Sequence, residues 1–488
     1  MPKEPLKICL ASSELTPLAK TGGLADVASA LSGFLQRDGH DIRVLMPFYS
    51  SIDTSDMEVT PVDYLQNQPI KMGHHHLQYS IDTARLPGTE LAIYLLRCPG
   101  LYDRSGVYTQ DADEHLRFIL LSRASIEMCQ KMGFAPDIFH CHDWHTSLVP
   151  LYLKTRYAWD RLFENTRSVL TIHNIGYQGV FSADILPDLG LQHETDKLHQ
   201  DDISHGMINF LKTGVLYADL LTTVSPNYAE EILDPEYGMG LQDILRQRRN
   251  SLVGILNGVD FNEWNPAADA LIPHAYDSRR IAGKKKNKLA LMKELDLDCS
   301  DDMPLIGMVT RLTGQKGLDL VEQVLPEMMQ QRRFALAILG SGESHYEQFF
   351  SWLQNRYRDR VCFYRGFNNK LAHMIEAGSD MFLMPSLFEP CGLNQMYSLR
   401  YGTVPIVRRT GGLADSVQQF DPSSKKGTGI VFNDYNASAL GWAINFALDL
   451  YPEKTTWRKL VRNGMAMDYS WEKQGHLYVD LFYRLAGK

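Results

Sequence analysis

Short apolar runs alternate along this chain with longer stretches in which apolar residues recur every three or four positions. The amphipathic stretches predict helices, most clearly over Ala25–Gln36 and Glu114–Lys131. The apolar runs predict strands, which in the first half are Lys7–Ala11, Ile42–Met46, Ile93–Leu96, Ile138–Cys141, Ser168–Ile172 and Leu220–Val224. Short buried strands that alternate with helices are typical of βαβ units and of a parallel sheet.

The alternation stops after the turn at Asn257–Asp260. Between Asn265 and Pro304 the sequence is polar and rich in Pro, Lys and Asp, and we expect the chain to cross between two domains at the start of this stretch. Its lysine run, Lys284–Lys286, is interpreted as a solvated face. The pattern then resumes with strands predicted at Leu305–Thr310, Ala335–Leu339, Val361–Tyr364, Met381–Met384 and Val404–Val407. The predicted fold class is therefore α/β, with two doubly wound domains.

Length and composition indicate the size class of the protein and the compartment in which it works. The 488 residues exceed what one core holds. No apolar run reaches the ~20 residues that a membrane helix needs, and the N-terminal segment lacks the apolar centre of a signal peptide. Dispersed cysteines without a CxxC pair favour a reducing compartment, with no disulfide framework and no zinc site. We therefore expect a cytoplasmic protein without a membrane partner. The cysteines are Cys9, Cys98, Cys129, Cys141, Cys299, Cys362 and Cys391.

The net charge of −9 argues against a nucleic-acid partner, because such proteins usually carry the opposite balance. An anionic ligand must then be bound by a few local cations. One candidate is a hexapeptide that occurs twice, Thr-Gly-Gly-Leu-Ala-Asp, at Thr21–Asp26 and Thr410–Asp415. A Gly-Gly turn that opens a helix offers amide groups to an anion or to sugar hydroxyls. Lys20 adds a charge to the first copy. The alternative is a tight strand-to-helix turn without a ligand.

Other candidate motifs follow predicted strands, where ligands bind in open parallel sheets. Arg311 and Lys316 lie on one glycine-containing loop and suit a pyrophosphate, since Arg can bind two oxygens and Lys acts as a point charge. Incidental loop charge is the alternative. Gly340 and Gly342 would let backbone approach a nucleotide, or form only a tight turn. Glu389 is an acceptor suited to sugar hydroxyls, or a helix cap. The amides of the next motif residues would open a helix: Cys391, Gly392 and Leu393.

Histidines gather after two strands. His142 and His145 invite a metal interpretation, but no third ligand has suitable spacing, so hydrogen bonding is favoured and no metal site is predicted. His173 ends a strand and is either a substrate hydrogen bonder or a structural histidine. The run His74–His76 is interpreted as a surface loop or strand edge with no role.

Together these motifs resemble the bacterial glycogen synthase and plant starch synthase family. The resemblance spans nearly the whole chain and rests on Lys20–Leu24, His142–His145, His173–Asn174, Arg311–Gly317, Glu389–Leu393 and Arg408–Asp415. It implies a GT-B fold, with two Rossmann-like domains facing across a cleft and a C-terminal helix returning to the first domain. The implied domains are residues 1–264 with about 470–488, and residues 265–469. The implied reaction moves glucose from ADP-glucose to the non-reducing end of an α-1,4-glucan with retention of configuration, releasing ADP and using no cofactor.

The resemblance also assigns roles. Catalysis would depend on His173, Arg311, Lys316 and Glu389. Substrates would contact Lys20, Gly22, Gly23, Asp26, Tyr102, Asp143, Asn174, Asn257, Gly340, Gly342, Phe367, Cys391, Gly392, Leu393, Thr410, Gly411 and Gly412. Phe367 stands where the family often has Tyr near the adenine, and Tyr397 where many related transferases have a second Glu. A UDP-glucose donor and a non-catalytic glucan-binding protein remain the alternatives. An NAD-dependent dehydrogenase does not fit, because no G-x-G-x-x-G follows the first strand.

Overall fold

The computed structural model describes residues 4–298 and 300–488, so Cys299 lies outside the described residues. The chain divides into two compact units. Unit 1 comprises Met1–Val224, Ala229–Gly258 and Trp471–Lys488, and unit 2 comprises Ser225–Tyr228 and Val259–Ser470. Within the described ranges no helix has the length and apolar character needed to span a membrane, and the cysteines placed there are free thiols.

The passage into unit 2 comes after Gly258, earlier than the sequence-based position between residues 264 and 265. Two contacts explain the shift. The Val259 amide donates to the Tyr469 carbonyl at 2.7 Å. The Trp264 ring stacks between the rings of His373 and Tyr397, with centroid distances of 3.8 and 3.9 Å. The residues from Val259 onward are therefore packed into unit 2.

Unit 1 is built on one sheet, which over the described residues has ten strands in the order β12-β11-β8-β7-β1-β2-β6-β5-β3, with β4 paired to β5. The strands from β12 to β6 are parallel, and β5 runs antiparallel to β6, β3 and β4. A separate antiparallel pair joins β9 to β10. The bounds are β1 Lys7–Ala11, β2 Asp41–Pro47, β3 Thr60–Pro61, β4 Gln68–Met72, β5 His75–Arg85, β6 Ala92–Arg97, β7 Ile138–His142, β8 Arg167–Ile172, β9 Val180–Ser182, β10 Met207–Asn209, β11 Leu220–Thr223 and β12 Leu252–Gly254.

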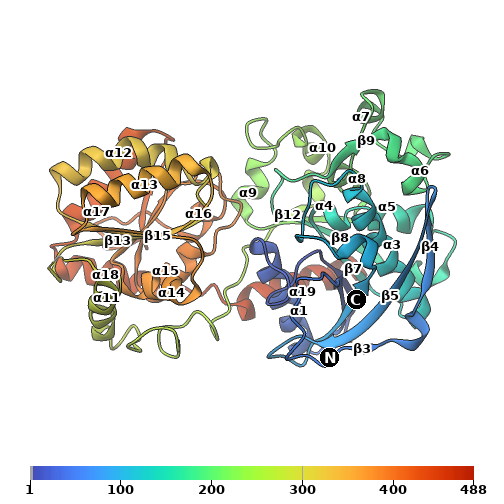
Figure 1. Cartoon of the computed structure of the whole chain (residues 1–488), viewed down its shortest axis with the longest axis horizontal. Coiled ribbons are helices and arrows are strands. Elements are labelled where there is room, and N and C mark those ends of the chain that lie inside the picture. The colour runs from blue at the N-terminus through green and yellow to red at the C-terminus, as the bar shows by residue number, and fades with distance from the viewer. Residues whose placement is uncertain (1–3, 299) are drawn as a thin grey trace. The chain divides into compact units, whose positions relative to one another are not determined.

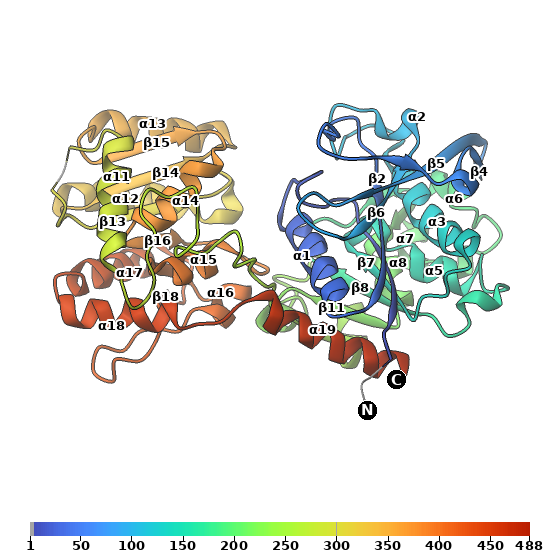
Figure 2. The same cartoon turned by 90° about the horizontal axis from the view of Figure 1, so that it is seen from below.

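Helices cover both faces of this sheet. The last helix, α19 (Trp471–Ala486), lies along α1 (Gly23–Arg37), as Figures 1 and 2 show. Gly475 permits this close packing, because a Cβ there would lie 2.3 Å from the Phe34 ring. The predicted return of the C-terminal helix to the first domain is confirmed. The helices on the other side of β7 and β8 are α3 (Glu114–Met132), α4 (Asp143–Thr146), α5 (Val149–Lys154) and α8 (Phe210–Tyr217).

Unit 2 contains a parallel sheet that, in the part of the chain described, has six strands in the order β15-β14-β13-β16-β17-β18. Its bounds are β13 Leu305–Val309, β14 Ala335–Gly340, β15 Val361–Arg365, β16 Met381–Met384, β17 Val404–Arg408 and β18 Ile430–Phe432. The strand order reverses between β13 and β16, so the topological switch point, where doubly wound sheets bind ligands, lies there. In unit 1 the order reverses in the same way between β1 and β7.

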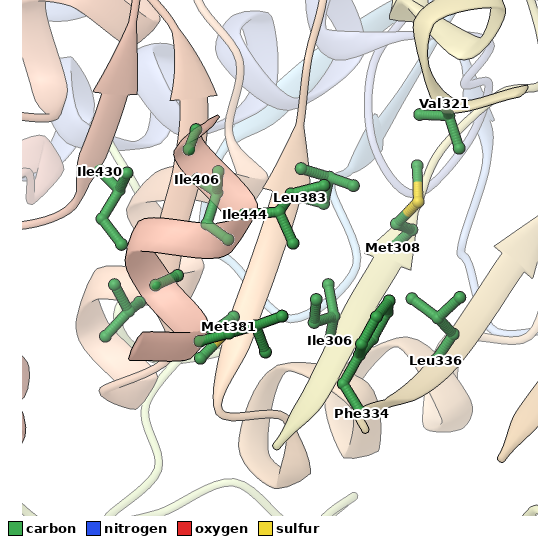
Figure 3. Close-up of a cluster of buried hydrophobic side chains, with 14 of the residues drawn as sticks. Ile306, Met308, Val321, Phe334, Leu336, Met381, Leu383, Ile406, Ile430 and Ile444 are labelled. Carbon is green, nitrogen blue, oxygen red and sulfur yellow. The ribbon is translucent and has the colours of Figure 1, made fainter. Parts of the chain in front are cut away.

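Helices sandwich the unit 2 sheet (Figure 1). One face carries α12 (Leu318–Gln331), α13 (Ser344–Arg356) and α17 (Ala437–Leu450), and the other carries α11 (Ala282–Glu294), α14 (Asn369–Gly378), α15 (Asn394–Tyr401) and α18 (Lys454–Met465). Figure 3 shows the core between the sheet and the first group, where Ile306, Leu383 and Ile406 of the strands lie beneath Val321 and Ile444 of the helices. These side chains are buried, as near-continuous apolar strands of a two-sided parallel sheet require.

One surface prediction needs correction. The run Lys284–Lys286 is exposed at Lys285 and Lys286, but Lys284 turns inward. Its ammonium donates to the Thr403 hydroxyl at 2.6 Å and to the Ala377 carbonyl at 3.2 Å. Burial lowers the pKa of Lys284 to about 7. The run is therefore only partly a solvated face, because the first lysine of α11 is hydrogen-bonded to both α14 and the loop before β17.

Candidate functional site

An ion pair joins the two loops at the switch point of unit 2. The loop after β13 carries Lys316 and the loop after β16 carries Glu389. The Lys316 ammonium lies 2.7 and 3.0 Å from the two carboxylate oxygens of Glu389. Both side chains are mostly buried, at 17% and 8% exposure, and the Ser386 hydroxyl donates to the same carboxylate at 3.0 Å. The structure thus brings together two residues that the sequence placed 73 positions apart.

Glycines make this close approach possible. A Cβ on Gly317, which has φ 69°, would lie 2.0 Å from the Pro385 carbonyl oxygen. A Cβ on Gly411, with φ 41°, would lie 1.9 Å from the Glu389 carbonyl oxygen, and one on Gly412 would lie 2.1 Å from that of Cys391. The Gly412 amide donates to the Glu389 carbonyl at 3.1 Å. The second Gly-Gly pair therefore packs directly against the loop that carries Glu389, and Thr410 beside it is fully buried.

The segment Cys391–Leu393 leads into α15, as the sequence predicts for a helix-opening motif. Gly392 has φ 70°, in the left-handed region that glycine adopts without strain. The side-chain amide of Gln395 donates through Nε2 to the carbonyls of Cys391 and Gly392, each at 3.0 Å, and to the Ser416 hydroxyl at 3.1 Å. These bonds fix the segment through its carbonyl groups, so its amide groups keep a defined direction at the start of the helix.

Two exposed groups lie on the loops that follow β13 and β15 in unit 2. Arg311 is exposed, and within residues 4–298 and 300–488 its guanidinium has no hydrogen bond or ion pair. Phe367 follows β15, and 84% of its surface is exposed. An unpaired cation and an uncovered aromatic ring beyond the carboxyl ends of parallel strands are suited to a phosphate and to a base, respectively.

Gly340 and Gly342 have a structural reason for being glycine. A Cβ on Gly340 would lie 2.1 Å from the Thr310 carbonyl oxygen, and one on Gly342 would lie 2.3 Å from that of Leu312. The Leu312 amide donates to the Ser341 carbonyl at 2.8 Å, and the Glu343 amide donates to the Leu312 carbonyl at 2.7 Å. The glycines thus dock the loop after β14 against the loop that carries Arg311. This accounts for the glycines without a ligand, and their contact with substrate stays a prediction.

In unit 1, the loop between β1 and α1 is organised by a carboxylate that the sequence analysis missed. Glu14 is 2% exposed. It accepts hydrogen bonds from the Thr21 amide and hydroxyl, from the Gly22 amide and from the Tyr108 hydroxyl. The Gly22 amide is therefore already used, whereas a Cβ on Gly22 or on Gly23 would meet no atom within 4 Å. The first Gly-Gly pair borders open space.

Lys20 projects from this loop with 51% of its side chain exposed and lies 2.7 Å from Asp26. Asp26 also accepts from the Thr16 hydroxyl at 3.0 Å. Exposed ion pairs of this kind contribute little to stability, so the lysine can exchange its partner for a ligand anion at small cost. The structure thus places Lys20 and Asp26 together on the exposed side of the loop between β1 and α1.

Asp143, His173 and Asn174 are brought together beyond the carboxyl ends of the neighbouring strands β7 and β8, beside the switch point of unit 1. Asp143 begins α4 with φ 52°, and its carboxylate accepts from the His173 amide at 2.7 Å and the Asn174 amide at 3.5 Å. Burial raises the pKa of Asp143 to about 7, against the lowering effect of these two amides. A carboxyl group that titrates near neutrality in a ligand-binding edge of a sheet is a functional-site candidate.

The histidines here are neutral hydrogen-bonding groups. His142 Nδ1 lies 2.9 Å from His173 Nε2, so one ring donates and the other accepts. Burial lowers the pKa of His173 to about 3 and that of His140 to about 3, the latter with help from His173. His140 Nε2 lies 2.7 Å from the Thr171 hydroxyl. His173 is therefore held as a neutral imidazole near neutral pH.

Two further predicted contacts have different outcomes. Asn257 is 4% exposed, and among the described residues its Oδ1 atom has no hydrogen-bond partner. Buried polar atoms are nearly always paired, so this one is suited to a ligand donor. Tyr102, by contrast, is fully buried, and its hydroxyl donates to the Arg117 carbonyl at 2.8 Å. The Tyr102 side chain therefore packs inside unit 1 in this structure, and its contact with the acceptor stays a prediction.

Known proteins match the chain along its length. The family model described as the starch synthase catalytic domain matches residues 7–247, and that described as glycosyl transferases group 1 matches residues 296–464. A glycogen synthase of Geotalea daltonii is 40% identical over 488 residues, which cover 98% of each chain. Glycogen synthase 1 of Geobacter sulfurreducens is 43% identical, over 99% of this chain and 97% of its own. This chain belongs to the glycogen synthase family.

Solved structures agree with this assignment. The catalytic domain of starch synthase IV from Arabidopsis thaliana, determined with ADP and acarbose bound, superposes with a TM-score of 0.91 at 31% identity and covers 99% of this chain and 100% of that one. A sucrose-phosphate synthase from Thermosynechococcus elongatus, at 18% identity and a TM-score of 0.61, shows the fold alone. These matches confirm three predictions for this member of the glycogen synthase family: the family itself, the GT-B fold class and the glucosyltransferase activity.

Proposed function

We propose that this chain is a glycogen synthase that transfers glucose from ADP-glucose to the non-reducing end of an α-1,4-glucan, with retention of configuration. One observation carries the assignment of its working residues. The Lys316–Glu389 ion pair bridges the two loops at the switch point of unit 2, and Arg311 lies exposed on the first of these loops. This is the arrangement that a diphosphate linked to a sugar requires, with cations for the phosphates and a carboxylate for the hydroxyls.

In unit 2, Arg311 and Lys316 bind the donor diphosphate, and the amides of Cys391–Leu393 and the Gly411–Gly412 pair approach the phosphate or the sugar. Phe367 stacks on the base. Glu389 accepts from glucose hydroxyls while it orients Lys316, as the 2.7 Å contact allows. In unit 1, Lys20 supplies a further cation. The transferred glucose is bound by Asp143, His173, Asn174 and Asn257.

Charge development explains why cations dominate this set. The bond between the glucose C1 atom and the diphosphate oxygen breaks, which leaves negative charge on the phosphate and positive character on the sugar. Fixed donors that face the leaving oxygen stabilise this charge without reorganisation. The acceptor O4 atom forms the new bond to C1, and its proton passes to the departing phosphate, so ADP leaves.

Retention through a covalent intermediate would need a second carboxylate close to the first. Tyr397 stands at the position where many related transferases have that group, and its ring stacks on Trp264 at 3.9 Å. This packing favours a structural role for Tyr397 and front-face attack of the acceptor. Trapping of a covalent glucosyl–enzyme would contradict the mechanism and leave the overall reaction intact.

The experiment supplies the full chain with glycogen and with radiolabelled ADP-glucose or UDP-glucose in parallel, and counts label in the precipitated polymer. Incorporation from ADP-glucose is expected. A preference for UDP-glucose would keep the reaction and overturn the donor, with attention shifting to the exposed Phe367 ring. Glycogen binding without incorporation from either donor would overturn the enzymatic proposal in favour of a non-catalytic glucan-binding protein.

A further inference from the structure

A histidine-rich hairpin lies in unit 1, apart from the residues assigned above. β4 and β5 are joined by a two-residue turn, Gly73-His74, with Met72 paired to His75. Gly73 has φ 57°, as expected for a hairpin turn that takes glycine at its first position. The turn places the rings of His74 and His75 3.9 Å apart, although adjacent residues of a regular strand face opposite ways. Two imidazoles therefore face the same neighbourhood.

A buried carboxylate meets this pair. Asp188, on the short helix α6 (Leu186–Leu189), is 10% exposed, and its Oδ1 atom lies 3.9 Å from His75 Nε2. Gly73 allows the approach, because a Cβ there would lie 2.1 Å from Asp188 Oδ1. One ligand atom from each of His74, His75 and Asp188 lies within 4.8 Å of the others. The backbone at Gly73 thus packs so closely against the Asp188 carboxylate that only glycine fits there.

A third histidine contacts the other oxygen of the same carboxylate. His115, on α3, is 7% exposed, and its Nε2 atom lies 3.0 Å from Asp188 Oδ2. The Nε2–H group donates to Oδ2, which leaves Oδ1 directed toward the hairpin. An outer group that fixes a ligating side chain is the usual second layer of a metal site. Asp188 is therefore held in place before any ion binds.

We propose that His74, His75 and Asp188 form a binding site for a divalent transition-metal ion of the zinc type. Two imidazoles and one carboxylate are a donor set that zinc accepts, with a fourth position left to water. Zinc bonds of ~2.1 Å need ligand atoms ~3.4 Å apart, so the site closes by a small movement. The His74 ring is exposed and is therefore free to make this movement. The ion would clamp the β4–β5 hairpin to α6, which gives the His74–His75 pair a structural role.

A second cluster, formed by His199, Asp201 and Asp202, also brings three ligand atoms together. It is the weaker candidate, because Asp202 already accepts from the Lys212 ammonium at 2.6 Å. That cation would compete with a metal ion for the carboxylate. In the described part of the chain Asp188 forms no ion pair with a lysine or an arginine, and the side chains that face its carboxylate are those of His75 and His115.

The test is titration of the untagged full chain, stripped with EDTA and dialysed, with Zn²⁺ alone by isothermal calorimetry. One tight site is expected, together with a Zn²⁺-dependent rise in the melting temperature. The double variant His74→Ala/His75→Ala should lose this site and the rise. His115→Gln should weaken binding by ~10- to 100-fold, the usual cost of an outer-layer partner. Co²⁺ should give a visible absorption band in the wild-type chain and none in the double variant.

The matched control is His76→Ala, since His76 belongs to the same run but lies outside the cluster. Its Zn²⁺ affinity should equal that of the wild-type chain. Asp201→Asn controls for the second cluster and should also leave the tight site unchanged. Equal losses of Zn²⁺ affinity in His76→Ala and in the double variant His74→Ala/His75→Ala would overturn the proposal, as would Zn²⁺ binding in the double variant as tight as in the wild-type chain. So would the absence of tight binding in the wild-type chain.

Discussion

Replacement of Lys316 by Met should separate the catalytic and structural parts of the ion pair with Glu389. Methionine keeps the length of the side chain and removes the charge. Loss of one preorganised donor to a developing oxyanion typically costs about 2.7–4 kcal/mol in the transition state. We therefore expect the rate of glucose transfer from ADP-glucose to fall by roughly 10²- to 10³-fold.

The same change also leaves the Glu389 carboxylate without its cation. Breaking a buried pair from one side costs ~3–5 kcal/mol. The lower end applies here because Lys316 is 17% exposed and Ser386 still donates to Glu389. Urea unfolding should therefore show a loss near ~3 kcal/mol. The double variant Lys316→Met/Glu389→Gln should recover most of this stability, since glutamine carries no charge, and should be at least as slow as Lys316→Met, because Glu389 also contacts the glucose.

Initial rates at saturating ADP-glucose and glycogen, with urea unfolding of the same preparations, measure both quantities. Lys286→Met is the matched control, because Lys286 is an exposed lysine of unit 2 on α11. It should change neither rate nor stability. A folded Lys316→Met variant that turns over like the wild-type chain would refute the assignment. Recovery of the rate together with stability in the double variant would show that the pair acts only in packing.

Three further outcomes follow. Asp143→Asn should gain stability relative to the wild-type chain as pH rises from 3.8 to about 7, and the difference should then stay level, because burial holds the proton on Asp143 in the folded state only. Urea unfolding across this pH range measures the difference in stability. Asparagine is a suitable replacement because it tolerates the positive φ. Phe367→Ala should raise KM for ADP-glucose on the order of tenfold while the melting temperature is unchanged, since base stacking contributes ~1–3 kcal/mol and the ring is 84% exposed. Asn257→Ala should slow transfer with little loss of stability, as judged by rates and melting temperature, because its Oδ1 atom has no partner in the described chain.

The central parallel strands of both sheets were predictable because their apolar runs are buried on both faces. The antiparallel edge formed by β3, β4 and β5 was missed, since its strands mix polar and apolar residues and include His75 and His76. Glu14 was missed for another reason. No motif marks it, because its nearer partners, Thr21 and Gly22, reach it only through the fold of the loop, and its partner Tyr108 lies 94 positions away. Lys284 was misjudged because its hydroxyl partner, Thr403, lies 119 positions away. The positions of these two side chains depend on contacts that the folded chain creates, which local sequence patterns do not reveal.

The repeated hexapeptide shows how far one motif determines function. Both copies open a helix after a parallel strand. In the second, each glycine is required by the loop beside it, since a Cβ on Gly411 would lie 1.9 Å from the Glu389 carbonyl oxygen. In the first, a Cβ on Gly22 or Gly23 would meet nothing within 4 Å. Packing within the chain therefore explains Gly411 and Gly412 but not Gly22 and Gly23. For Gly22 and Gly23, which packing does not explain, contact with a ligand is the better reason for having glycine, and Lys20 lies beside them.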